Sequence, residues 1–222
     1  MNTLVVKDLS YSYFDDENEN KILRGVNAEF KSGKVYAIIG ESGSGKTTLI
    51  SLISALDKLQ DGDILWNEKS IKKIGTQEFR LKYVNIVFQS YNLINYMTAK
   101  ENVEVAIDFA GLKNKNGSLA YEILEGLGIG KVKADREVLK LSGGEQQRVA
   151  IARCIASDEP ILVADEPTGN LDKKTEENIL EVFSRLAHEQ NKCVIIVTHS
   201  KKVAGMADVV YEMEDGKLSL SK

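Results

Sequence analysis

The sequence predicts an α/β fold in which helices cover a mainly parallel sheet and a separate helical lobe is inserted. Two observations carry this prediction. Short apolar runs rich in β-branched residues alternate with helix-like segments near both ends of the chain. Between about residues 91 and 156, apolar residues recur instead at helical spacing and glycines interrupt them.

The first half of the chain supplies most of the predicted strands. Short apolar runs rich in β-branched residues and bounded by turn residues predict strands at residues 4–6 and 35–39. Further strands are expected at residues 22–30, at 61–67 after a turn, and at 86–88. The charged residues 14–21 between the first two strands predict an exposed loop. Helical spacing of apolar residues predicts a helix over residues 47–56.

The second half begins with the helical lobe and returns to the sheet. Apolar residues at 103, 107 and 109, and again at 123, 124 and 127, predict two helices. Glycines at 111, 117, 126, 128 and 130 are expected to break the helices of this lobe. A strand at residues 161–164, a helix at 174–188, a strand at 194–198 and a hairpin at 209–218 complete the chain.

Composition limits the classes of protein to consider. The 222 residues fit one large domain, and 43% apolar residues suffice for an ordinary core. Lys and Arg total 29 and Asp and Glu total 33, so the formal charge is −4. This weak acidity gives no electrostatic footprint for nucleic acid, and we expect no nucleic-acid partner.

The chain shows no feature of export or membrane insertion. Its first ten residues lack a basic segment followed by a long apolar core, so we expect no signal peptide. The longest apolar runs, 161–164 and 194–197, are far shorter than the ~20 residues of a membrane span. Cys154 and Cys193 match no metal spacing, and small buried apolar residues in a reduced cytoplasmic compartment are the simplest interpretation.

A glycine-rich loop follows the strand at residues 35–39 and fits G-x-x-x-x-G-K-[ST]. Its backbone N–H groups and the dipole of the next helix suit phosphate oxygens. Lys46 can reach the β- and γ-phosphates, and the Thr47 hydroxyl can ligate Mg²⁺. The predicted nucleotide-binding residues are Gly40, Glu41, Ser42, Gly43, Ser44, Gly45, Lys46, Thr47 and Thr48.

Two acidic residues end the strand at 161–164. The carboxyl end of a buried parallel strand faces the ligand crevice of such a sheet. Asp165 there can hold Mg²⁺ through water, and Glu166 can orient and deprotonate an attacking water. A GTPase would be expected to carry an N-K-x-D motif that reads the base, and the sequence has none, so an ATPase is favoured over a GTPase.

A second glycine turn reads Leu141, Ser142, Gly143, Gly144 and Glu145 and also opens a helix. It has no lysine or Mg²⁺ ligand, so an independent second nucleotide site is not favoured. The alternative is that Ser142 and the glycine amides cap the γ-phosphate held by another copy of the chain. This arrangement predicts a two-fold homodimer with two ATP molecules between the subunits.

The phosphate loop, the LSGGE turn and the strand-terminal Asp-Glu pair, in this order, resemble the nucleotide-binding domain of ABC ATPases over essentially the whole chain. The resemblance implies one domain over residues 1–222, with a P-loop NTPase core and an antiparallel β subdomain in residues 1–90 and 157–222. An α-helical lobe is then inserted at about residues 91–156. The implied activity is hydrolysis of ATP, with ATP and Mg²⁺ as cofactors.

The family pattern also assigns residues that local chemistry would leave open. Lys46, Glu166 and His199 are implied as catalytic, with His199 touching the γ-phosphate. Gln89 resembles the glutamine that senses Mg²⁺ and links the site to the membrane partner. An aromatic residue stacks on adenine in this family, and Tyr13 fits it better than the neighbouring Tyr11. The loop that communicates across the dimer resembles Asn170, Leu171 and Asp172.

The departures from the family pattern are mild. Glu145 stands where glutamine is usual, a variation expected to preserve binding. Ser200 follows His199 where the family often has aspartate, with no effect assigned. His188 matches no motif and is expected to be an exposed helix residue.

The residues Ala164 to Asp172 and the segment 93–103 are similar to one branch of the family, MacB-like ATPases of macrolide export, lipoprotein release and FtsE-type complexes. In that branch a small ATPase pairs with a separate membrane permease, which places it in the cytoplasm on the inner face of the plasma membrane. The function implied is export or extraction, with an FtsE-type regulator of envelope enzymes as the alternative. Soluble ABC ATPases and small-molecule kinases fit less well.

The segment after Gln89 predicts where the permease docks. Tyr91, Leu93, Tyr96 and Met97 offer aromatic and apolar anchors for a short coupling helix. The alternative is that these side chains form the core of the helical lobe.

Overall fold

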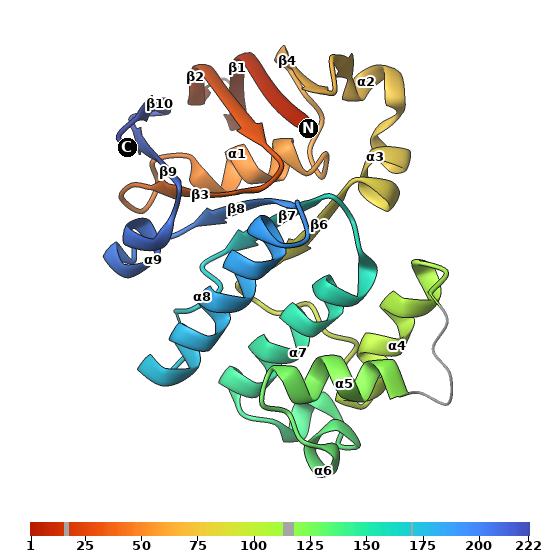
Figure 1. The fold of residues 1–222 in the computed structure, drawn as a ribbon. Coiled ribbons are helices and arrows are strands. Elements are labelled where there is room, and N and C mark those ends of the chain that lie inside the picture. The colour runs from red at the N-terminus through yellow and green to blue at the C-terminus, as the bar shows by residue number, and fades with distance from the viewer. Residues whose placement is uncertain (16–17, 113–117, 170) are drawn as a thin grey trace. The chain divides into compact units, whose positions relative to one another are not determined.

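The computed structural model describes residues 1–15, 18–112, 118–169 and 171–222. Its internal contacts divide the chain into two compact units. The first comprises Met1–Ile86, Glu159–Glu166 and Val182–Lys222, and the second comprises Val87–Asp158 and Pro167–Glu181. Figure 1 shows the helices and strands of each unit. The predicted α/β class is confirmed, with parallel and antiparallel sheets.

The larger of the two sheets has six strands in the order β10-β9-β3-β8-β7-β6. Strands β3, β7, β8 and β9 run parallel, and β10 is antiparallel to β9. The continuous apolar runs of β7 and β8 are buried along their length, as a sheet covered on both faces requires. The strands are β3 (Lys34–Ile39), β6 (Val84–Val87), β7 (Ile161–Asp165), β8 (Cys193–Val197), β9 (Val209–Glu214) and β10 (Lys217–Leu220).

A four-stranded antiparallel sheet of order β2-β1-β4-β5 belongs to the first unit. Its strands are β1 (Thr3–Asp15), β2 (Asn18–Lys31), β4 (Asp61–Trp66) and β5 (Lys69–Ser70). The loop predicted at residues 14–21 is wrong, because β1 and β2 stay paired as far as Asp15 and Asn18. Backbone hydrogen bonds extend this hairpin although its side chains are polar, and residues 16 and 17 lie outside the description.

The two sheets of the first unit share one core with helix α1 (Lys46–Ile53). This helix contacts β2, β7 and β8 and buries Leu49, Ile50, Leu52 and Ile53. The helix predicted to reach residue 56 ends earlier, since Ala55 has a left-handed φ of 54°. Three short helices were not predicted: α2 (Ile71–Ile74), α3 (Thr76–Lys82) and α9 (Lys201–Met206).

The second unit is mainly helical. Helix α4 (Ala99–Phe109) packs on α7 (Gly143–Ser157), and α5 (Ser118–Gly126) contacts both. The short helix α6 (Lys131–Ala134) contacts α4 and α5, and the 3₁₀ turn η2 (Val138–Lys140) leads toward α7. Helix α8 (Lys173–His188) begins in this unit and ends in the first. Gly117 lies outside the described residues.

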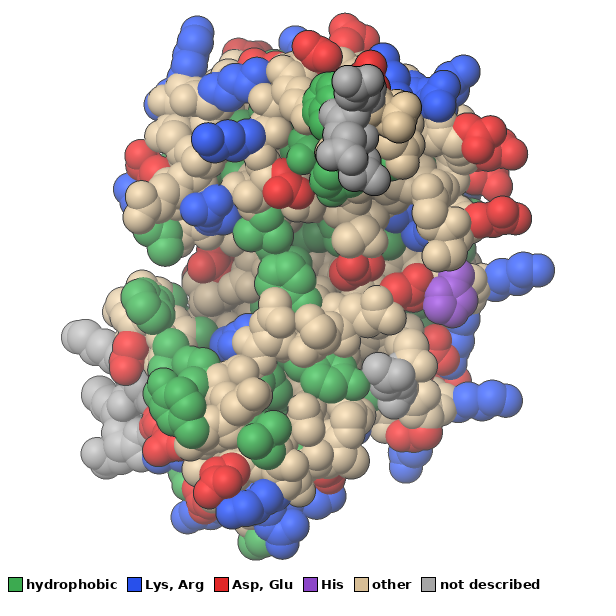
Figure 2. Space-filling model, turned by 180° about the vertical axis from the view of Figure 1, so that it is seen from behind, with side chains coloured by type: hydrophobic (Ala, Val, Ile, Leu, Met, Phe, Trp, Pro, Cys, Tyr) green, Lys and Arg blue, Asp and Glu red, His purple; other side chains and the backbone are tan. Residues whose placement is uncertain are grey.

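The helices of the described residues can be compared with the requirements of a membrane span, and the charged side chains with the net charge. Within the described ranges, no helix has the length and apolar character needed to cross a bilayer. On the face drawn in Figure 2, basic and acidic side chains are interspersed. This mixture is in keeping with the formal charge of −4.

Candidate active site

The phosphate loop lies between the end of β3 and the start of α1, as its sequence predicts. Gly45 is the N-cap of α1 with a left-handed φ of 107°, and no side chain caps this helix. Gly40 lies against the backbone of β9: a Cβ on it would be 2.3 Å from the carbonyl oxygen of Met213. Glycine is therefore needed at Gly40 for space and at Gly45 for backbone conformation.

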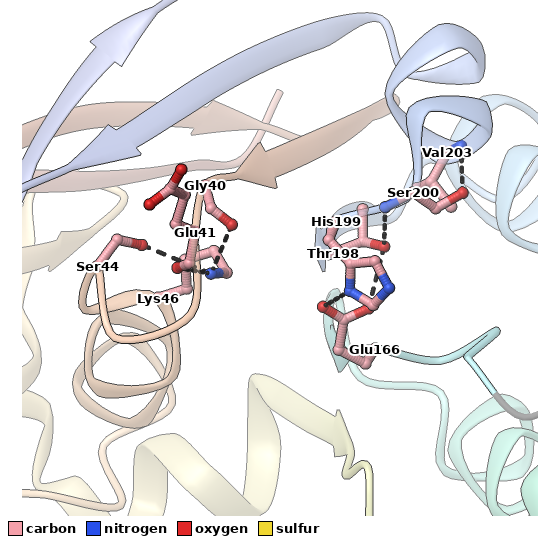
Figure 3. Close-up of polar contacts among 9 residues, drawn as sticks. All are labelled: Gly40, Glu41, Ser44, Lys46, Glu166, Thr198, His199, Ser200 and Val203. Atoms are coloured by element: carbon pink, nitrogen blue, oxygen red, sulfur yellow. Dashed lines mark hydrogen bonds and ion pairs between the residues drawn. The ribbon is translucent and has the colours of Figure 1, made fainter.

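The Lys46 ammonium group lies inside the curve of this loop. Its Nζ donates to the carbonyl oxygens of Gly40 at 2.9 Å and Glu41 at 2.6 Å, and lies 3.5 Å from Ser44 Oγ (Figure 3). These contacts hold a positive charge among the backbone groups that surround it. The arrangement suits a polyphosphate.

Asp165 and Glu166 lie where β7 ends, at the edge of the sheet that also carries the phosphate loop. Burial raises the pKa of Asp165, and the nearby Glu166 charge raises it further. Lys46 and a hydrogen bond from the Thr47 side chain oppose that rise. Asp165, Lys46 and Thr47 are therefore close enough to interact.

Glu166 is held from two sides. Its backbone has a left-handed φ of 47°, and its N–H donates to the carbonyl oxygen of Val197 at 2.9 Å. The Thr198 hydroxyl donates to Oε2 at 3.1 Å, and His199 Nδ1 lies 2.8 Å from Oε1. Figure 3 shows both side chains directed at the Glu166 carboxylate. The carboxylate is thus oriented while the imidazole, 78% exposed, remains accessible.

Thr198 is the residue of this cluster that the sequence reasoning missed. It is fully buried, and its Oγ1 also accepts the N–H of Ser200 at 3.0 Å. Its place directly before His199, at the end of an apolar strand, was the available signal. Ser200 in turn caps α9 by accepting the N–H of Val203 at 3.5 Å. Serine and aspartate are both favoured N-cap residues, so Ser200 can cap α9 in the place where the family resemblance implies aspartate.

A cavity of about 630 Å³ brings the phosphate loop and His199 together. Its lining also includes the turn between β9 and β10, which the sequence had not connected with the site. The lining residues are Ile39, Gly40, Glu41, Ser42, Gly43, Ser44, His199, Ser200, Lys201, Ala204, Glu212, Met213, Glu214 and Asp215.

The two candidate adenine-stacking tyrosines differ in exposure. Tyr13 is 47% exposed on β1, whereas Tyr11 is half-buried and packs against the core. Their rings meet edge to face with centroids 5.1 Å apart. Exposure favours Tyr13 as the ring that is open to a ligand.

The second glycine turn belongs to the second unit. Leu141 is buried, Ser142 is the N-cap of α7, and Glu145 completes a capping box with it. The N–H of Ser142 donates to Glu145 Oε2 at 2.8 Å, and the N–H of Glu145 donates to Ser142 Oγ at 3.4 Å. A Cβ on Gly143 would lie 3.1 Å from the Tyr91 hydroxyl, while Gly144 continues the helix.

The remaining predicted residues also belong to the second unit. Gln89 is exposed, two residues after the end of β6. Asp172 precedes α8 and accepts the N–H groups of Lys174 and Thr175, both at 3.1 Å. The Thr175 hydroxyl and these N–H groups lower the pKa of Asp172. The hydrogen bonds make Asp172 a cap of α8, which the sequence analysis did not predict. Leu171 is half-buried, and Asn170 lies outside the described residues.

Comparison with known proteins gives a consistent result. The family model of the ABC transporter matches residues 23–169. An uncharacterized ABC transporter ATP-binding protein of Bacillus subtilis, YclH, is 43% identical over 223 residues, covering 100% of this chain and 98% of that protein. The lipoprotein-releasing system ATP-binding protein LolD of Rickettsia felis is 38% identical, covering 98% of each.

A solved structure shows the same fold. The ATP-binding cassette MJ0796, a dimer in a post-hydrolysis state bound to ADP and Pi, superposes with a TM-score of 0.91. It is 33% identical, with 99% of each chain covered. The resemblance inferred from the motifs is therefore confirmed, and this chain belongs to the ABC transporter family as an ATP-binding cassette with ATPase activity.

Proposed function

We propose that this cassette is the Mg²⁺-dependent motor of a membrane transporter, acting as an ATP-sandwiched homodimer that drives a separate permease. The observation that carries the catalytic part is the Glu166 carboxylate. Thr198 and His199 hold it at 3.1 Å and 2.8 Å beside Asp165, at the edge of the sheet that bears the phosphate loop. A base that removes a proton from water needs this kind of fixed orientation.

Binding begins with the phosphate loop. Loop amides and Lys46 hold the phosphates, and Tyr13 stacks on the adenine. Asp165 and Thr47 offer a carboxylate and a hydroxyl that interact with each other, a hard oxygen set that fits Mg²⁺. Gln89 is the third proposed ligand. When bound, the metal neutralises charge on the phosphates.

Hydrolysis then depends on the Glu166 cluster. Glu166 accepts a proton from a water as the water oxygen bonds to the γ-phosphorus, and the bond from that phosphorus to the ADP oxygen breaks. Thr198 and His199 fix the carboxylate, and His199 also contacts the γ-phosphate. The raised pKa of Asp165 reflects burial that the bound cation would offset.

The homodimer gives the second glycine turn its role. The capping box uses the N–H groups of Ser142 and Glu145 and does not involve those of Gly143 and Gly144. These two amides and the Ser142 hydroxyl cap the γ-phosphate bound by the other copy. Leu141 anchors the turn, and Asn170, Leu171 and Asp172 communicate between the subunits. The dimeric state of the similar cassette MJ0796 supports this arrangement.

The partner is a permease with an extracytoplasmic domain, which places the cassette on the inner face of the plasma membrane for export or extraction. The relative LolD, named for a lipoprotein-releasing system, supports this role. The segment proposed to receive the coupling helix is held by the buried Asn102, whose side chain bonds the backbone of Ile94 at 2.8 Å and 3.2 Å. Tyr96 is 80% exposed, and Tyr91, Leu93 and Met97 are half-buried, so this segment is not a closed core.

The docking role has a direct test. Tyr96→Glu is expected to leave the ATPase folded and to lower the fraction that sediments with native membranes. Phe109→Glu, an equally exposed aromatic at 84% on the end of α4, is the matched control. Equal sedimentation of the two variants would contradict docking at this segment.

The catalytic role is tested with Glu166→Gln. This variant is expected to retain ATP binding, to lose about 10²–10⁴ in turnover and to accumulate as a dimer with ATP. Turnover by phosphate release and mass by light scattering are the measurements. Turnover near the wild-type rate would remove Glu166 from the role of base.

A further inference from the structure

The carboxylate of Glu145 is engaged at both oxygens. Oε2 accepts the N–H of Ser142 at 2.8 Å, which belongs to the capping box of α7. Oε1 lies 2.6 Å from Nζ of Lys133, which comes from the separate short helix α6. Lys133 therefore ties a second element to the first turn of the signature helix.

This carboxylate stays charged. The Lys133 ammonium group and the Ser142 N–H together lower the pKa of Glu145 to about 2. Its side chain is only 14% exposed, whereas that of Lys133 is 48% exposed. A full negative charge therefore stands in the first turn of the helix that, under the proposed function, meets the γ-phosphate of another copy.

Such a charge has two opposite effects. A carboxylate at a helix N-terminus stabilises the helix, because the dipole there is positive. The same carboxylate repels an incoming phosphate. A cation paired with the carboxylate leaves the helix stabilised and reduces the repulsion of the phosphate.

We propose that Lys133 is a positioning residue of the ATP-bound dimer, which fixes Glu145 in the capping box and offsets its charge where the γ-phosphate docks. This inference rests on the proposed function, because it needs the signature turn to face ATP held by a second subunit. It also explains how glutamate is tolerated at a position where the family usually has uncharged glutamine.

Two nearby lysines among the described residues are engaged elsewhere. Lys131, on the same helix, lies over the ring of Tyr121 at 5.3 Å. Lys140 pairs with Glu137 at 3.1 Å. Lys131→Met is therefore a matched control, since it removes the same charge from α6 without touching Glu145.

The experiment uses the full chain carrying Glu166→Gln, so that hydrolysis does not disturb the dimer. Lys133→Met, Glu145→Gln, the double variant and Lys131→Met are added to it. The dimer dissociation constant with ATP is measured by sedimentation at low and high salt. ATP affinity of each monomer is measured separately at protein concentrations below dimerisation.

Lys133→Met is expected to weaken the dimer about tenfold, because a contact worth about threefold occurs twice in a symmetric dimer. Monomer affinity for ATP should not change, and the defect should shrink at high salt, where charge repulsion is screened. The double variant should return to the dimer affinity of Glu145→Gln alone. Lys131→Met should match its parent.

Three outcomes would overturn the inference. A double variant as weak as Lys133→Met would show that Lys133 acts through folding and not through the charge of Glu145. A Lys133→Met dimer as tight as its parent would show that the pair has no role. If the Glu166→Gln parent itself failed to dimerise with ATP, the proposed homodimer would fail first and the inference with it.

Discussion

The two glycine turns of this cassette open their helices in opposite ways. Helix α1 has Gly45 as its N-cap residue, with no side-chain cap and no acidic residue in its first turn. Helix α7 has Ser142 as its N-cap residue, and Ser142 and Glu145 form a complete capping box. The first N–H groups of α1 are therefore available to a ligand, whereas the N-terminus of α7 is fixed by its own side chains.

This difference in capping indicates that the two turns have different roles, one in binding ATP and the other in forming the dimer. A bare N-terminus with a lysine inside the loop gains most from binding a polyphosphate, because the ligand supplies the missing partners. A capped N-terminus gains less from an anion but keeps its shape without one. We therefore expect the first turn to determine ATP affinity and the second to determine assembly.

Of the effects that separate the two turns, the largest is expected in the first turn. Lys46→Ala should lower ATP affinity by about 10- to 100-fold, because a charged hydrogen-bond donor to the phosphates is lost. Equilibrium binding of ATP to the monomer measures this. Lys82→Ala is the control, since Lys82 pairs only with exposed Glu78 on the same helix among the contacts described. Unchanged affinity in Lys46→Ala would contradict the assignment of the first turn.

Many residues of the candidate site could be predicted from the sequence, but the contacts that support them could not. The phosphate loop, Asp165 and Glu166 are recognisable because their chemistry is carried by adjacent residues. The support of Glu166 by Thr198 and His199 joins residues more than 30 positions apart, so only the fold displays it. The Lys133 pair with Glu145 is likewise formed between two helices.

The wrong prediction of a loop at residues 14–21 has a physical reason. The hairpin of β1 and β2 continues through polar residues, where backbone pairing leaves no alternation of apolar side chains to detect. The expectation that His188 is an exposed helix residue is confirmed, since it ends α8 and its side chain is 44% exposed. The sequence did not show that its Nε2 lies 2.9 Å from Asp208 Oδ2. Asp208 also accepts the N–H of Val35 at 2.7 Å, so this second histidine–carboxylate pair joins α8 to the sheet.

A smaller effect is expected in the second turn. Ser142→Ala should lower the free energy of unfolding by about 1 kcal/mol through loss of the cap, without changing ATP affinity of the monomer. It should also weaken ATP-dependent dimerisation. Thr98→Ala removes the same kind of capping box from α4 and is the matched control. If both variants weakened the dimer equally, the second turn would have no special part in assembly.

The smallest expected effect is the pH dependence of the stability that Glu145 contributes through the same capping box. The pKa of Glu145 is lowered from 4.5 to about 2, so its carboxylate contributes stability that is fully present above about pH 4.5. That contribution should decline as the pH falls below this value and disappear near pH 2, where the folded state also takes up the proton. Thermal unfolding of wild type and Glu145→Gln should therefore differ above pH 5 and converge as the solution is acidified. The amplitude should stay below that of the Ser142 cap, because Lys133 is 48% exposed and solvent screens the pair. Lys131→Met leaves the Lys133–Glu145 pair intact and should follow the wild-type curve. If the difference between wild type and Glu145→Gln grew on acidification, the pair would be absent in solution.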